Sequence, residues 1–86
     1  MNISDLSSNI RAWRDAEKDH RAVIMIAVDS SRQPLIEANF GIDGNRRLLV
    51  EALKCEVLRD DTLLTLLNQA LSELSEGIQP IEIHLN

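Results

Sequence analysis

The segment Ala22–Phe40, "AVIMIAVDSSRQPLIEANF", decides the fold. It opens with seven consecutive apolar residues, most of them β-branched, which is typical of a strand buried on both faces. A polar turn follows and ends at Pro34, after which apolar and polar residues alternate up to Phe40. The segment therefore predicts a β-hairpin with strands over residues 22–29 and 35–40, and we expect the first strand to be central.

Apolar residues recur at helical spacing on both sides of this hairpin. Upstream they form a narrow stripe that predicts a helix over residues 4–19, made by Ile3, Leu6, Ile10 and Trp13. Downstream, leucine-rich runs predict helices over 45–58 and 61–76, and the acids of Asp60–Asp61–Thr62 suit the positive start of the second of these helices. Strict alternation over 81–85 predicts a last strand.

The order of elements, αββααβ, predicts an α+β fold with two layers in a single domain, residues 1–86. We expect a three-stranded sheet with the first strand between the other two and the helices packed on one face. One apolar side of the first strand is then exposed, either Val23, Met25 and Ala27 or the residues that alternate with them. We take Val23, Met25 and Ala27 as the candidate interface of a homodimer, since exposed apolar sheet surfaces commonly mediate self-association.

Charge is distributed unevenly along the chain. All nine Lys and Arg residues lie at or before Arg59, so the net charge of −5 resides in the acidic segment from Asp60 onward. This acidic C-terminal half is a candidate surface for a protein partner. Nucleic-acid binding is not expected, because only two aromatic residues are present and the basic stripe of the first helix is interleaved with acids; the stripe is Arg11, Arg14, Lys18 and Arg21.

Catalytic and metal-binding signatures are absent from the sequence. Cys55 has no sequence motif that ties it to a base, and His20 and His84 are not at metal-ligand spacing. We therefore expect no enzyme activity, no cofactor and no metal. The N-terminus has no basic and apolar leader pattern and no apolar run is long enough to cross a membrane, which favours a cytoplasmic protein.

The turn Gly41–Arg47 provides the alternative function. Two glycines precede a predicted helix, and a helix N-terminus with nearby arginines is suited to an anion. Residues Gly44, Asn45, Arg46 and Arg47 are thus a candidate site for a small anion or a nucleotide. A turn followed by a helix cap explains the same residues, and Asp43 lies where an anion would bind.

The segment Ile36–Ala70 combines an extended strand, a Gly-x-x-Gly-Asn turn, "LLVEAL" and the acidic restart "RDDTLLTLL". In this it resembles small proteins of unknown function encoded in prophages and mobile elements of gut bacteria. The resemblance implies a bacterial or phage cytosolic protein and assigns no catalytic residue. The sequence as a whole favours a small non-enzymatic protein-interaction module that self-associates through its sheet.

Overall fold

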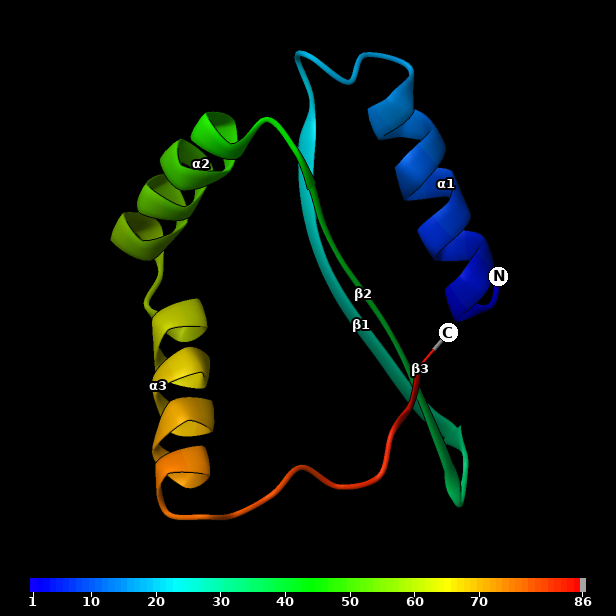
Figure 1. Ribbon diagram of the computed structural model, residues 1–86, viewed down its shortest axis with the longest axis vertical. Coiled ribbons are helices and arrows are strands. Elements are labelled where there is room, and N and C mark those ends of the chain that lie inside the picture. The colour runs from blue at the N-terminus through cyan, green and yellow to red at the C-terminus, as the bar shows by residue number, and fades with distance from the viewer. Residues whose placement is uncertain (86) are drawn as a thin grey trace. The chain divides into compact units, whose positions relative to one another are not determined.

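The computed structural model describes residues 1–85 (Figure 1). Its elements, in chain order, are α1 (Ile3–Asp15), β1 (Ala22–Arg32), β2 (Leu35–Gly44), α2 (Arg46–Arg59), α3 (Thr62–Ser75) and β3 (His84–Leu85). The predicted α+β fold with the order αββααβ is confirmed. The chain forms two compact units: a sheet unit, Met1–Leu49 with the segment from Glu82 onward, and a helical unit, Val50–Ile81.

Strands β1 and β2 form a long antiparallel hairpin, in which Ala22 lies opposite Gly44 and Asp29 lies opposite Glu37. The pairing is irregular between Asp29 and Arg32, beside the turn. Strand β2 continues four residues beyond its predicted end at residue 40, because Gly41 pairs with Met25 within the ladder instead of ending it. The strand ends at Gly44, whose φ of 102° only glycine adopts readily.

The sheet order is β1-β2-β3, so β2 lies between the other two strands. The prediction of a central first strand is therefore wrong. The reason is that β3 pairs in parallel with β2, with His84 opposite Glu37 and Leu85 opposite Ala38, on the side of β2 that faces away from β1. Strand β3 is also shorter than the predicted strand over 81–85, since only two of these residues join the sheet.

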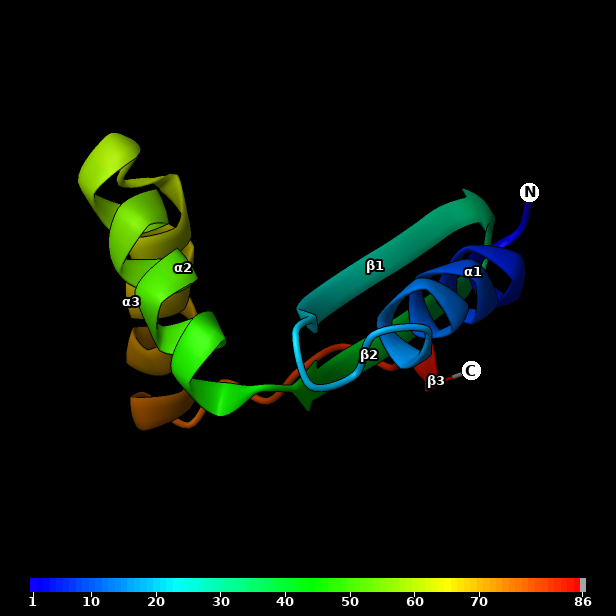
Figure 2. The ribbon, with the colours of Figure 1, turned by 90° about the horizontal axis from the view of Figure 1, so that it is seen from above.

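Helix α1 packs against both β1 and β2, on one face of the hairpin (Figure 2). Its start is fixed by a capping box: Asn2 Oδ1 accepts from Asp5 N at 2.8 Å and Asp5 Oδ2 accepts from Asn2 N at 3.4 Å. The helix ends at Asp15, before its predicted end at residue 19, and two successive turns over residues 16–20 lead into β1.

The helical unit contains most of α2 and all of α3. The predicted restart at Asp60 is confirmed, because Asp60 Oδ1 accepts from both Thr62 N at 2.8 Å and Thr62 Oγ1 at 2.6 Å, and α3 begins at Thr62. Gly77, with a φ of 82°, closes α3, and Ile78 N donates to Glu73 O at 3.0 Å. The apolar stripe of α3 is largely exposed at Leu66, Leu67, Leu71 and Leu74.

Candidate functional site

The two faces of the hairpin differ in what covers them. Residues directly opposite each other in an antiparallel pair place their side chains on the same face. Ala27 lies opposite Asn39 and Val23 lies opposite Asp43. Two polar contacts from α1 reach this face: Ser7 Oγ donates to Asn39 Oδ1 at 3.0 Å, and Arg14 forms an ion pair with Asp43. This is therefore the face that α1 covers.

The opposite face of the hairpin, here named the far face, is formed by Ile24, Ile26, Val28, Phe40 and Ile42. Ile26 lies opposite Phe40, and Ile24 lies opposite Ile42. All five side chains are exposed, with Ile26 at 71% and Ile42 at 75% of their full accessibility. Leu85, which pairs beside Ala38, extends the same surface and is exposed too. The far face is thus a contiguous apolar surface on a sheet, the kind of surface that mediates protein association.

The predicted interface residues Val23, Met25 and Ala27 lie on the face that α1 covers, and all three are half-buried. The exposed side of β1 is the alternating set, Ile24, Ile26 and Val28, and this corrects the choice made from the sequence. Both sets are apolar, so β1 by itself does not distinguish them. The signal was in β2, where the polar residues Asn39 and Asp43 mark the face that is joined to α1.

The buried core is very small for so apolar a chain. Of the sequence, 44% is hydrophobic. Yet among residues 1–85 Ala38 is the one apolar residue that is buried. None of these residues has a large side chain that is fully buried. The two other buried residues are polar, Ser7 and Asn39. A core of this size contributes little of the apolar burial that stabilises a small domain, so further burial by association is physically favoured.

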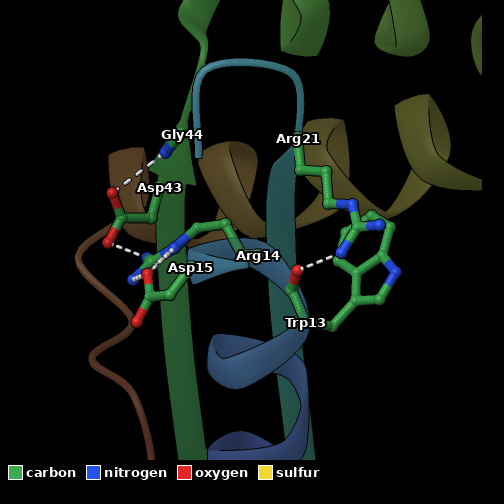
Figure 3. A network of polar contacts seen from close by, with 6 residues as sticks. All are labelled: Trp13, Arg14, Asp15, Arg21, Asp43 and Gly44. Atoms are coloured by element: carbon green, nitrogen blue, oxygen red, sulfur yellow. Dashed lines mark hydrogen bonds and ion pairs between the residues drawn. The ribbon is translucent and has the colours of Figure 1, made fainter. Parts of the chain in front are cut away.

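A polar network holds the end of α1 beside the end of the hairpin (Figure 3). Arg14 donates from Nε to Asp15 Oδ1 at 2.8 Å and pairs with Asp43 on β2. The hydrogen bond to Asp15 raises the pKa of Arg14, desolvation opposes this, and the charges of Asp15 and Asp43 raise it further. Arg21 lies over the Trp13 ring, 4.7 Å from its centre, and donates to Trp13 O.

This network explains half of the basic stripe that the sequence shows on the first helix. Arg14 is paired with carboxylates of the sheet unit, whereas Arg21 stacks on the Trp13 ring, so the two do not act together as one basic surface. Lys18 and Arg21 also lie beyond the end of α1 at Asp15, where the helical spacing of the stripe no longer applies.

The candidate anion site at Gly44, Asn45, Arg46 and Arg47 is occupied by the chain's own polar groups. Asn45 Oδ1 accepts from Leu48 N at 3.3 Å, which caps α2. Asp43 Oδ1 accepts from Gly44 N at 2.9 Å, so a carboxylate already lies at this amide. Gly44 is required for close packing, because a Cβ there would lie 2.4 Å from Arg21 O. These contacts favour the interpretation of the turn as a cap.

The remaining candidates for chemistry lie apart from one another. Cys55 is exposed on α2, in the helical unit, and carries a free thiol. No group of three or more His, Cys, Asp or Glu side chains within residues 1–85 is arranged to hold a metal ion. The hollow beside α3 is lined mainly by apolar groups, and two of its three polar side chains, Gln69 and Glu73, hydrogen-bond to each other at 3.1 Å. The far face remains the best-defined candidate surface.

Comparisons with known proteins add no family to this description. No family model, no curated protein and no solved structure matches the chain. Within residues 1–85, no helix is long and apolar enough to cross a membrane.

Proposed function

We propose that this chain is a small non-enzymatic protein-interaction module that self-associates as a homodimer through its β1–β2 hairpin. The observation that carries the proposal is the far face, where Ile24, Ile26, Val28, Phe40 and Ile42 are all exposed on one side of the sheet. Monomeric proteins rarely leave such a contiguous apolar surface in contact with water.

The magnitude of the hydrophobic effect supports association. Burying an exposed Val, Ile or Phe side chain stabilises a protein by about 1.5–3 kcal/mol, and less where the side chain is already partly covered. Where two far faces stack, ten such side chains would contribute on the order of 10–20 kcal/mol, against a cost of about 4–15 kcal/mol for the lost freedom of two molecules. The far face is therefore large enough to hold two copies together.

The mass in solution tests this proposal. Light scattering over a dilution series of the intact chain should give twice the monomer mass of 9.7 kDa at high concentration, with dissociation on dilution. Ile26→Lys places a charge on the far face and should weaken self-association by at least about tenfold, since a lysine on a strand edge is a common natural protection against pairing.

Leu58→Lys is the matched control, because it introduces the same charge at an even more exposed apolar residue outside the sheet, at 89% of full accessibility. It should leave the dissociation constant unchanged. A wild-type chain that stays monomeric at millimolar concentration, or two lysine variants that behave alike, would contradict the proposal.

A further inference from the structure

Strand β1 lies at an edge of the sheet and lacks the features that usually protect an edge. It pairs with β2 on one side only, since the sheet order is β1-β2-β3. Its regular part, Ala22–Val28, carries no charge, no proline and no bulge, and the irregularity in pairing begins only after Asp29. Natural edge strands are commonly shortened, charged or bulged to prevent pairing with another chain. The edge of β1 is therefore open to an added strand.

The backbone groups on this edge can be assigned from the register of the hairpin. Asn45 N donates to Arg21 O at 3.5 Å, and these two residues continue the register in which Ala22 lies opposite Gly44. They form a hydrogen-bonded pair, and such pairs alternate with non-hydrogen-bonded pairs along an antiparallel ladder. Residues Ala22, Ile24, Ile26 and Val28 thus direct their N–H and C=O groups away from β2, toward the open edge.

This edge is complementary to itself when a second copy runs antiparallel to it. Placing Met25 opposite Met25 of the second copy sets Ile24 opposite Ile26 and Ala22 opposite Val28, so the apolar run pairs with itself along its whole length. The same register sets Arg21 opposite Asp29, once at each end. A shift of the two strands by two residues in either direction loses this pairing of opposite charges. A shift by one residue moves every side chain of the strand to the other face of the sheet.

The two charged groups are in a suitable state for this pairing. Asp29 Oδ1 accepts from Ser31 N at 2.8 Å, and the hydrogen bonds from the Ser31 side chain and backbone lower the pKa of Asp29, so its carboxylate is ionised at neutral pH. Arg21 is held in place by its stacking on Trp13. Arg21, the residue before β1, and Asp29 also lie on the same face of the extended chain, because they are eight positions apart.

We propose that β1 pairs antiparallel with β1 of a second copy, about a two-fold axis at Met25, to form one continuous six-stranded sheet. The inference rests on the proposed self-association and gives it a geometry in which the two far faces join side by side as one face of the larger sheet and do not stack on each other. About eight backbone hydrogen bonds form across the two copies, two for each of the four hydrogen-bonded pairs. The arrangement also makes β1 central, which is the position that its continuous apolar run favours and that a single copy does not provide.

Disulfide formation between single cysteines tests the register in the intact chain. The exposed Cys55 is first replaced by Ser, and Met25→Cys, Ile24→Cys, Ile26→Cys and Phe40→Cys are then introduced one at a time. Directly opposite residues in a non-hydrogen-bonded pair have Cα atoms about 4.5 Å apart, within the range of a disulfide. Met25→Cys should therefore give a covalent dimer under mild oxidation.

The other three cysteines should remain reduced, and between them they report on two different failures. Two copies of Ile24 or of Ile26 are offset along the strands by two residues, about 7 Å, and two copies of Phe40 are three strand spacings apart, about 14 Å. Cross-linking at Ile24 or Ile26 in place of Met25 would overturn the register. Cross-linking at Phe40 would show that the far faces stack, which overturns the edge pairing and retains the proposed function. A wild-type chain that is monomeric by light scattering overturns both.

Charge reversal provides a second test that does not depend on oxidation. Arg21→Glu alone and Asp29→Arg alone each place like charges opposite each other twice in the dimer, and each should raise the dissociation constant by about tenfold. A mixture of the two variants forms heterodimers in which both pairs are again of opposite charge, so the affinity should return close to that of the wild type. Equal dissociation constants for the mixture and for the separate variants would overturn the pairing of Arg21 with Asp29.

Discussion

Ser7 on α1 donates a hydrogen bond to Asn39 on β2, with 3.0 Å between Oγ and Oδ1, and both residues are buried. The two lie 32 positions apart in the sequence. This contact lies on the face of the hairpin that α1 covers, and Ile24, Ile26 and Val28 lie on the other, exposed side. The candidate interaction surface is thus the side of the sheet opposite to this polar contact.

Removing the Ser7 hydroxyl should destabilise the sheet unit. Ser7→Ala takes a buried donor away from Asn39 Oδ1, and the loss of such a partner costs about 1–3 kcal/mol. Urea unfolding followed by circular dichroism measures the change. Ser8→Ala is the control, because Ser8 is the next residue of the same helix and is exposed, so its free energy of unfolding should change by less than about 0.5 kcal/mol. Equal stabilities of the two variants would show that the contact does not hold α1 in place.

Gly44 should be intolerant of any side chain. Its φ is 102°, and a Cβ would lie 2.4 Å from Arg21 O and 2.6 Å from Ala22 Cα, both of which are backbone atoms. Gly44→Ala is expected to lower the free energy of unfolding by about 2 kcal/mol or more.

Gly41→Ala is the matched control in the same strand. A Cβ at Gly41 meets no atom within 4 Å, and the residue does not have a positive φ. The substitution should change the stability by less than about 1 kcal/mol, since glycine in a strand interior has no advantage over alanine there. Thermal unfolding of the two variants side by side separates these expectations, and a Gly44→Ala chain as stable as Gly41→Ala would contradict the close approach.

Asp60 should make the start of α3 sensitive to acid. The hydrogen bonds from the Thr62 hydroxyl and from the Thr62 backbone N–H lower the pKa of Asp60 below its ordinary value. A carboxyl group with a lowered pKa in the folded state contributes stability that is present above the unfolded pKa, about 3.9, and that is lost as the pH falls through the folded pKa.

Asp60→Asn should therefore destabilise the chain at neutral pH, and the difference from the wild type should disappear at a pH below the folded pKa. Helicity measured by circular dichroism during thermal unfolding at several pH values follows this difference. Asp61→Asn is the control, because the Asp61 side chain makes no capping hydrogen bond. A difference between Asp60→Asn and the wild type that is independent of pH would assign the effect to something other than the charge.

Hydrophobic periodicity was sufficient to predict the order of the elements. The restart of the helix at Asp60 was also predictable, because an acid before a helix N-terminus has a local physical role that does not depend on tertiary contacts. The start of α1 was less well predicted: Asn2 forms the capping box with Asp5, whereas the predicted range begins at residue 4.

The pairing of the strands could not be read from the sequence. The apolar run Ala22–Val28 is compatible with a central strand, but position in a sheet depends on where the chain returns, and β3 returns to the outer side of β2. The sequence also did not show which face of β1 is exposed, because both faces of the strand are apolar. Its assignment required the register that places Asn39 and Asp43 under α1, and register depends on contacts between distant residues.

Phosphate or a nucleotide should leave the melting temperature of this chain unchanged. The turn before α2 already uses its polar groups: Asn45 Oδ1 caps the helix at Leu48 N, and the carboxylate of Asp43 accepts from Gly44 N and pairs with Arg14. An added anion would have to displace these contacts and approach a negative charge. A ligand at a hundred times its dissociation constant adds about 2.7 kcal/mol of stability, which in a domain of this size raises the melting temperature by about 10–20 °C.

A shift of that size is easily measured, so thermal unfolding in saturating phosphate gives a decisive result. The double variant Arg46→Gln, Arg47→Gln is the control for specific binding, since it keeps the cap at Asn45 and removes both candidate cations. If the melting temperature rises in the wild type and not in the double variant, the turn is an anion site and the interpretation as a helix cap is wrong. No rise in either chain leaves the hairpin as the functional surface, and this outcome is expected because the groups an anion would need are already bonded within the fold.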